Sequence, residues 1–268
     1  SPEQIVVASA AVEDTVPDIA AAIRVGAQRM SRADMLSALF NAAPFAIGVA
    51  GTSGKSTVTG MIAWILHRTG KSPTVMNGAV MKNFRTPEAL FSSSLVGTSG
   101  LFVSEVDESD GSIAAYNPRV AVLMNIALDH KTMDELRALF GGFAARAETV
   151  VLNLDNAETA RLAEGFPAAI TYSLDNPAAQ LTASSIWPGP TMIKFSVHDR
   201  KSGETAAIRL ATPGLHNVSN ALAAIAAAMT CGVRLGGAAA ALGEFQGIAR
   251  RFDIVGTAGD IAVIDDFG

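Results

Sequence analysis

Short apolar runs alternate with helical patterns over the first two thirds of the chain. The runs are rich in Val, Ile, Leu and Phe, and they are short enough to be buried strands. They cover residues 5–7, 45–49, 101–106, 120–126, 149–152 and 168–172. Because strands that alternate with helices build βαβ units, this order predicts an α/β fold with a mostly parallel sheet and helices on both faces.

Helical periodicity is clearest in two of the intervening segments and in one later segment. Apolar side chains recur every three or four positions in residues 58–66 and 133–143, which places them on one face of a helix. Residues 218–229 form a further helical segment that is rich in Ala. The abundance of small side chains favours helices that pack closely against the sheet.

From about residue 180 to residue 210 the hydrophobic pattern changes to a period of two. Residues 191–198 alternate in this way, and turn residues at 188–190 and 202–203 separate the runs. This pattern predicts a small antiparallel sheet that is appended to the main one. Residues 254–264 are expected to form a hairpin.

The composition is that of a globular protein, with 49% hydrophobic and 17% charged residues among 268, enough for one full domain plus fragments. The formal net charge of -5 leaves no basic field for nucleic acid or an anionic membrane, so neither partner is expected. No apolar run reaches the roughly 18 residues of a membrane-spanning helix. The single cysteine, Cys231, excludes an intramolecular disulfide and a CxxC metal site, which favours a cytoplasmic setting.

A glycine-rich loop directly follows the apolar run that begins at residue 45, and a helical pattern follows the loop at once. Backbone N–H groups in such a loop converge on an anion, and the helix dipole favours negative charge there. Lys55 would reach the β- and γ-phosphates of ATP, and the Ser56 hydroxyl would join the shell of Mg²⁺. The alternative is a glycine turn with an exposed lysine, but the strand and helix around it favour ATP binding. The loop reads Gly51, Thr52, Ser53, Gly54, Lys55, Ser56, Thr57.

Carboxylates gather where the apolar run of residues 101–106 ends. Ligands of a doubly wound sheet bind at the carboxyl ends of its strands, so an acid there can reach a metal ion held by the nucleotide. Glu105 is the best candidate because it still lies inside the apolar run. A solvated acidic loop is the competing interpretation, and it suits Glu108 and Asp110 better than Glu105.

Two further polar groups follow apolar or turn segments. His130 comes after the run of residues 120–126, where a histidine is more often structural and imidazole is an unusual ligand for Mg²⁺. Asn217 and Asn220 lie three positions apart and therefore share a helix face. Their amides suit the edge of adenine, although Asn217 alone would also serve as a helix cap.

Several of these strings together resemble the Mur ligases of bacterial cell-wall synthesis. The resemblance covers nearly the whole chain, from Ile5 to Asp266. It narrows in the acidic string, which resembles the alanine-adding branch of the family more than the other branches. The strings that carry it are 51–57, E-x-D-E-S-D-G-S at 105–112, N-I-x-x-D-H at 125–130, G-x-H-N-x-x-N at 214–220, and the weaker elements 247–253 and 264–266.

The resemblance implies an ATP-dependent ligase with Mg²⁺ as its metal ion. By this likeness Lys55, Glu105 and His130 would be catalytic, and Ser56, Glu105 and His130 would hold Mg²⁺. ATP would also contact Asn217 and Asn220 through adenine, Arg251 through phosphate and Asp266 through ribose. Lys131 is adjacent to the metal motif, but no lysine is identified for carbamylation.

The same resemblance implies a division of the chain into three parts. Residues 1–43 would be a remnant of an N-terminal UDP-sugar-binding domain, 44–250 the central P-loop-type domain, and 251–268 the start of a C-terminal domain, the outer two being partial Rossmann-like domains. The absence of an initiator Met also makes us expect part of a longer protein.

The implied reaction joins UDP-N-acetylmuramate to L-alanine or a peptide through an acyl phosphate. Ser53 stands where the alanine-adding and tripeptide-recycling ligases have His, so the substrate pair stays open. A folylpolyglutamate or poly-γ-glutamate ligase, or a P-loop ATPase that acts as a switch, is the alternative.

Overall fold

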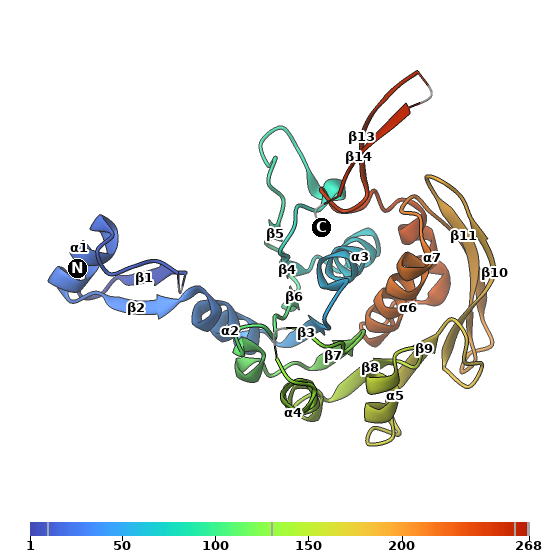
Figure 1. Ribbon diagram of the computed structural model, residues 1–268, viewed down its shortest axis with the longest axis horizontal. Coiled ribbons are helices and arrows are strands. Elements are labelled where there is room, and N and C mark those ends of the chain that lie inside the picture. The colour runs from blue at the N-terminus through green and yellow to red at the C-terminus, as the bar shows by residue number, and fades with distance from the viewer. Residues whose placement is uncertain (10, 130, 260, 267–268) are drawn as a thin grey trace.

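The body of the molecule is one ten-stranded sheet (Figure 1). The structure is a computed structural model that describes residues 1–9, 11–129, 131–259 and 261–266. From one edge to the other the strands are β12 (Thr205–Leu210), β11 (Ile193–Asp199), β10 (Leu181–Pro188), β9 (Ile170–Ser173), β8 (Thr149–Asn153), β7 (Val120–Leu123), β3 (Phe45–Ala50), β6 (Leu101–Glu105), β4 (Thr74–Met76) and β5 (Ser94–Leu95).

Seven neighbouring strands of this sheet, from β10 to β4, run parallel to one another. At the β12 edge of the sheet, β10, β11 and β12 form an antiparallel meander, so β10 belongs to both the parallel and the antiparallel part. The predicted mostly parallel α/β fold is thus confirmed, and so is the antiparallel pattern of residues 180–210. The antiparallel strands extend the main sheet directly, because β10 pairs in parallel with β9 through Leu181 and Tyr172.

Helices cover both faces of the sheet (Figure 1). On one face lie α3 (Lys55–Arg68), α6 (Leu215–Thr230) and α7 (Leu235–Gly243), and on the other lie α2 (Arg32–Ala42), α4 (Met133–Ala145) and α5 (Ala157–Ala163). Alternate residues of β3 enter the two cores: Ile47 packs with the α3 side and Ala46 with the α4 side. The alanines of α6 from 223 to 228 are fully buried, as expected for close helix packing.

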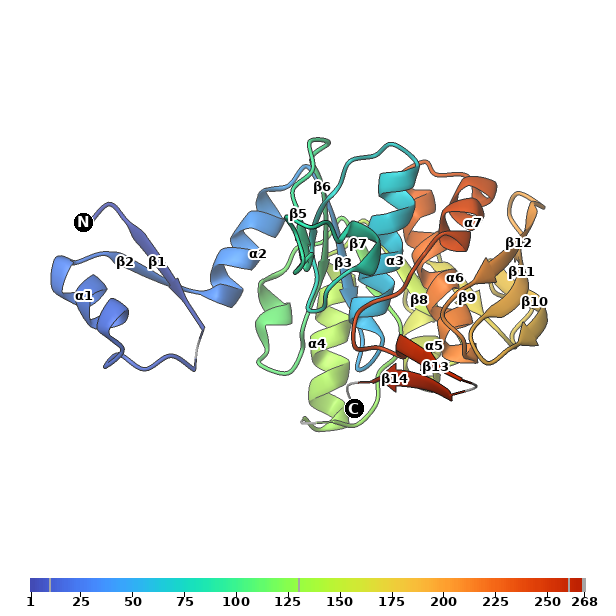
Figure 2. The same cartoon turned by 90° about the horizontal axis from the view of Figure 1, so that it is seen from above.

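A separate parallel pair of strands lies at the N-terminal end of the chain, away from the main body (Figure 2). It consists of β1 (Ile5–Ala8) and β2 (Gln28–Ser31), joined by the crossover helix α1 (Pro17–Val25). The following helix, α2, packs against the main body, because its buried Phe40 lies edge-on to Phe102 and Tyr116.

The C-terminal end forms a two-stranded hairpin of β13 (Asp253–Ala258) and β14 (Ile261–Asp265), as the sequence predicted. Two 3₁₀ turns complete the described elements, at Lys82–Phe84 and Ser112–Ala115. None of the described helices is both long enough and apolar enough to cross a membrane.

Candidate functional site

The glycine-rich loop connects β3 to α3 and leaves the N-terminal end of α3 open. Gly51 and Gly54 have φ angles of 147° and 86°, a region that side chains disfavour. A Cβ on Gly51 would lie 3.1 Å from the backbone oxygen of Asn125, and one on Gly54 would lie 3.0 Å from Oδ1 of Asn220. The two glycines therefore permit a tight turn into α3, and the N–H groups at the start of a helix are able to bind a phosphate.

Asn125, at the end of β7, holds this loop in place. Its Oδ1 accepts a hydrogen bond from the Ser53 N–H at 2.9 Å, and its Nδ2 donates to the Ser53 carbonyl at 3.0 Å. Its own carbonyl accepts from the Thr52 N–H at 3.1 Å. Asn125 was expected only as part of the motif at residues 125–130, and these three hydrogen bonds identify it as the residue that fixes the loop.

Lys55 is paired with a buried carboxylate. Its Nζ lies 3.0 Å from Oε2 of Glu108 and donates to the Gly51 carbonyl at 2.9 Å. The Glu108 side chain is only 6% exposed, so the interpretation of Glu108 as a solvated loop residue was wrong. The tight turn after β6 folds Glu108 back toward α3, where the lysine charge stabilises its buried carboxylate.

Glu105, at the end of β6, contacts Ser56 in the first turn of α3. Ser56 Oγ donates to Glu105 Oε2 at 2.8 Å. Gly78 lies directly beside this carboxylate, and any Cβ there would overlap it. Asn77 donates from Nδ2 to the Ser56 carbonyl at 2.9 Å. Asn77 and Gly78 were missed, although an Asn-Gly pair after an apolar run is a recognised turn signal.

The pair Ser56 and Glu105 offers oxygen ligands of the kind that Mg²⁺ prefers. Among the described residues, no group of three or more His, Cys, Asp or Glu side chains is gathered as a metal cluster. Magnesium that accompanies a nucleotide is commonly held by one or two carboxylates together with phosphates and water, so this sparse set fits such an ion. His130, the other predicted ligand, lies outside the described residues.

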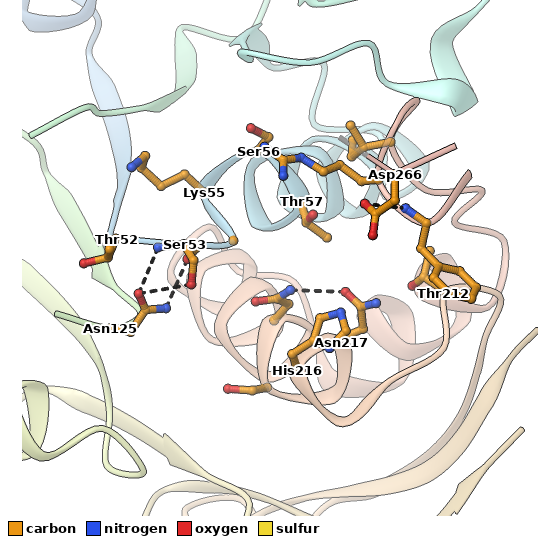
Figure 3. Close-up of a pocket in the computed structure, with 16 residues that line it drawn as sticks. Thr52, Ser53, Lys55, Ser56, Thr57, Asn125, Thr212, His216, Asn217 and Asp266 are labelled. Carbon is orange, nitrogen blue, oxygen red and sulfur yellow. Dashed lines mark hydrogen bonds between the residues drawn. The ribbon is translucent and has the colours of Figure 1, made fainter. Parts of the chain in front are cut away.

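A cavity of about 520 Å³ opens beside the loop (Figure 3). It brings together most of the predicted nucleotide-binding residues, whereas Gly51 and Glu105 do not line it. Glu105 reaches its edge through Ser56. The lining consists of residues 52–57, Asn125, Thr212, His216, Asn217, Ser219, Asn220, Ile248, Arg251, Phe252 and Asp266.

The two predicted asparagines project from the first turns of α6. Asn217 donates from Nδ2 to the Pro213 carbonyl at 2.7 Å, and its Oδ1 accepts from Asn220 Nδ2 at 3.2 Å. The N-cap position is occupied by Gly214, and no side chain caps this helix. Asn217 therefore does not act as the cap that the sequence left open as an alternative, and both amides lie against the cavity.

Residues that flank the C-terminal hairpin form the remaining wall. Asp266 Oδ1 accepts a hydrogen bond from the Phe252 N–H at 3.2 Å, and Arg251 also lines the cavity. Lys82 anchors the start of the hairpin through an ion pair with Asp253 at 2.7 Å. Burial raises the pKa of the Asp253 carboxyl, but the hydrogen bonds from Lys82 and Arg250 and the charges of Lys82 and Arg85 together outweigh it and lower the pKa overall.

Asp110 lies in the turn that follows Glu108. Its Oδ1 accepts from the Ser112 N–H at 2.8 Å. Burial acts to raise its pKa, but the hydrogen bonds from Ser112 hold the pKa below its usual value. Burial also raises the pKa of nearby Tyr116 to about 12, so this phenol stays protonated near neutral pH. Near neutral pH this region thus combines an ionised carboxylate, Asp110, with a neutral phenol, Tyr116.

The chain matches the family model described as the Mur ligase middle domain over residues 49–228. It is 37% identical to a UDP-N-acetylmuramate–L-alanine ligase of Synechococcus sp. (strain JA-3-3Ab) and 36% identical to one of Magnetococcus marinus. These alignments cover 98% of this chain in each case. The chain spans 50% and 56% of the lengths of these two curated relatives.

Two solved structures share the fold over nearly the whole chain. The UDP-N-acetylmuramate-alanine ligase of Thermotoga maritima superposes with a TM-score of 0.84 at 27% identity, covering 98% of this chain and 60% of that one. A murein peptide ligase of Psychrobacter arcticus gives a TM-score of 0.79 at 30% identity, with coverages of 99% and 60%.

Proposed function

This chain belongs to the Mur ligase family, and we propose that it is the ATP-binding part of a ligase that joins UDP-N-acetylmuramate to L-alanine or a peptide. The observation that carries the proposal is the joint placement of Lys55, Ser56 and Glu105 beside a cavity large enough for a nucleotide. The relatives at 37% and 36% identity are both UDP-N-acetylmuramate–L-alanine ligases, which supports the same substrates.

The residues proposed to hold ATP lie on three walls of the cavity. The loop from Gly51 to Thr57 would bind the phosphates through backbone N–H groups and Lys55. Asn217 and Asn220 would contact adenine, while Arg251 would neutralise phosphate charge and Asp266 would bind the ribose. The proposal also includes the division of the chain into three domains at residues 43 and 250. It further includes a cytoplasmic setting.

Ser56 and Glu105 would hold Mg²⁺, and His130 would hold a second ion. When bound, Mg²⁺ neutralises charge that develops on the phosphates during transfer. Lys55 would leave Glu108 for the γ-phosphate, because a phosphate carries more charge than one carboxylate. When no nucleotide is bound, the buried Glu108 would hold the Lys55 side chain in place through their ion pair.

The proposed reaction has two steps. An oxygen of the substrate carboxylate attacks the γ-phosphorus, ADP leaves, and an acyl phosphate forms. The amine nitrogen of the second substrate then attacks the acyl carbon, loses a proton and expels inorganic phosphate. The protein supplies orientation and positive charge, since phosphoryl transfer depends mainly on these two effects.

Substrate screening of the complete enzyme tests the proposal. Phosphate release would be measured with ATP, Mg²⁺ and UDP-N-acetylmuramate, with L-alanine, a cell-wall tripeptide or glutamate as acceptor. Release should require both substrates, whereas release without any carboxylate would identify an ATPase switch. Release with folate or polyglutamate substrates alone would favour the ligase class that Ser53 leaves open.

Isotope labelling tests the chemistry independently of the substrate choice. The carboxylate of the accepted substrate would be labelled with heavy oxygen and turned over with ATP. One labelled atom should appear in the released phosphate, because an oxygen of that carboxylate bonds to phosphorus in the acyl phosphate. Unlabelled phosphate would exclude this mechanism.

A further inference from the structure

Two buried hydroxyl groups have no hydrogen-bond partner in the part of the chain that the structure describes. They belong to Thr59, which is fully buried in α3, and Thr212, which is 8% exposed between β12 and α6. A buried polar atom without a partner costs stability, and such atoms are uncommon in folded proteins. Each therefore needs an explanation.

The two threonines differ in where they lie. Thr212 lines the nucleotide cavity, together with Ile248 and Phe252, whereas Thr59 is not part of its lining. Figure 3 shows Thr212 near Asp266 and well separated from Thr52 and Lys55 at the other end of the cavity. The Thr212 side chain is thus in reach of a ligand that fills the cavity, at the end remote from the phosphate loop.

We propose that the Thr212 hydroxyl forms a hydrogen bond with the nucleoside part of the bound nucleotide. This inference rests on the proposed function, which places the phosphates at the start of α3 and so leaves the base and ribose for the Thr212 end. A hydroxyl both donates and accepts, so it suits the edge of a base or a ribose hydroxyl. The side chain lines the cavity while its hydroxyl oxygen is buried, so the proposed contact requires rotation about the χ1 bond to present the hydroxyl to the ligand.

The proposal predicts effects of opposite sign for one substitution. Thr212→Val keeps the shape of the side chain and removes the hydroxyl. The Tm of the nucleotide-free protein should rise, because an unsatisfied polar group is removed from the interior. Its affinity for ATP should fall roughly five- to tenfold, as expected when one hydrogen bond to the ligand is lost.

The matched control is Thr59→Val, which removes the other unpartnered hydroxyl. Its Tm should also rise, but its Kd for ATP should stay that of the wild type. Thr212→Ser retains the hydroxyl and should bind ATP nearly as tightly as the wild type. These variants separate the loss of the hydroxyl at the cavity from a general change in core stability.

Calorimetry on the complete enzyme with Mg²⁺ and either ATP or ADP gives the decisive measurement. The loss in Thr212→Val should have the same factor for both nucleotides, because they share the nucleoside. A loss confined to ATP would assign the contact to the γ-phosphate and overturn the inference. Wild-type affinity in Thr212→Val would also overturn it, whereas a wild type that binds no ATP would overturn the proposed function itself.

Discussion

The two ends of the nucleotide cavity are built from opposite chemistry. At the carboxylate end, Lys55 and Ser56 line the cavity, and each contacts a carboxylate outside the lining, Glu108 or Glu105, at 2.8 to 3.0 Å. At the amide end, formed by Asn217 and Asn220, neutral groups are joined by one hydrogen bond of 3.2 Å. The first end has to exchange its ionic partners when a nucleotide binds, and the second has only to add new hydrogen bonds.

Because of this difference, we expect variants at one end to change the rate of turnover and variants at the other end to change the affinity for ATP. Charges that develop on phosphates in the transition state are stabilised strongly by a fixed cation, so changes at the carboxylate end should act on turnover. A neutral amide contacts the nucleoside equally in the ground and transition states, so changes at the amide end should act on binding. The comparison fails if variants at the two ends affect kcat and Kd alike.

The largest effect is expected for Lys55→Ala. Turnover of ATP by the complete enzyme should fall by at least about a hundredfold, because the cation beside the γ-phosphate is lost. The lysine side chain is only 18% exposed, so the alternative interpretation as an exposed loop lysine does not hold. Its removal should also lower stability, since Glu108 keeps a buried charge without its partner.

The double variant Lys55→Ala/Glu108→Gln distinguishes these two effects. It should recover much of the lost Tm, because the uncompensated carboxylate is replaced by a neutral amide. It should recover none of the turnover. Turnover that returned together with stability would show that Lys55 acts only through the fold.

Glu105→Gln should have the next largest effect. The amide cannot bind Mg²⁺ as strongly as a carboxylate, so we expect the Mg²⁺ concentration for half-maximal turnover to rise by about tenfold or more. Titration of Mg²⁺ at fixed ATP measures this shift. Glu148→Gln changes a surface carboxylate that pairs with Arg119 and should leave the titration unchanged.

At the amide end, Asn220→Ala should weaken ATP binding by about tenfold and change kcat less than twofold. The affinity would be measured by calorimetry and kcat by phosphate release. Asn41→Ala is the matched control, because it also removes a hydrogen-bonded side-chain amide, here bonded to Ala115 and Asn117, but lies outside the cavity lining. A drop in kcat as large as that of Lys55→Ala would remove the distinction between the two ends.

The layout of the two ends was predictable only in part from the sequence. The strands that carry the loop and Glu105 were predicted because they are continuous apolar runs next to clear motifs. The shorter β4 and β5, and the helices α2, α5 and α7, gave no comparable periodicity. Hydrophobic periodicity detects only elements that are long enough to repeat their pattern.

The partners within the site were harder to predict than its motifs. Glu108 meets Lys55 across 53 residues of sequence, and Asn125 meets Ser53 across 72. These contacts depend on the strand order β4-β6-β3-β7, which the sequence pattern does not contain. Strand order follows from how the whole sheet packs. The contacts of Asn77, Gly78 and Asn125 within the site could therefore be identified only in the structure.

The smallest effect concerns how the stability contributed by Asp110, in the turn that follows Glu108, depends on pH. The pKa of Asp110 is lowered in the folded protein, so its ionised form stabilises the fold above its unfolded pKa of about 4. This stabilisation should disappear as pH falls through the folded pKa. The Tm difference between wild type and Asp110→Asn should therefore be on the order of 1–2 °C near neutral pH and vanish once the pH lies below the lowered pKa of the folded protein. Asn220→Ala should change Tm by the same amount at every pH, because an amide has no proton to gain, and a pH-dependent difference there would contradict the contrast between a charged and a neutral end.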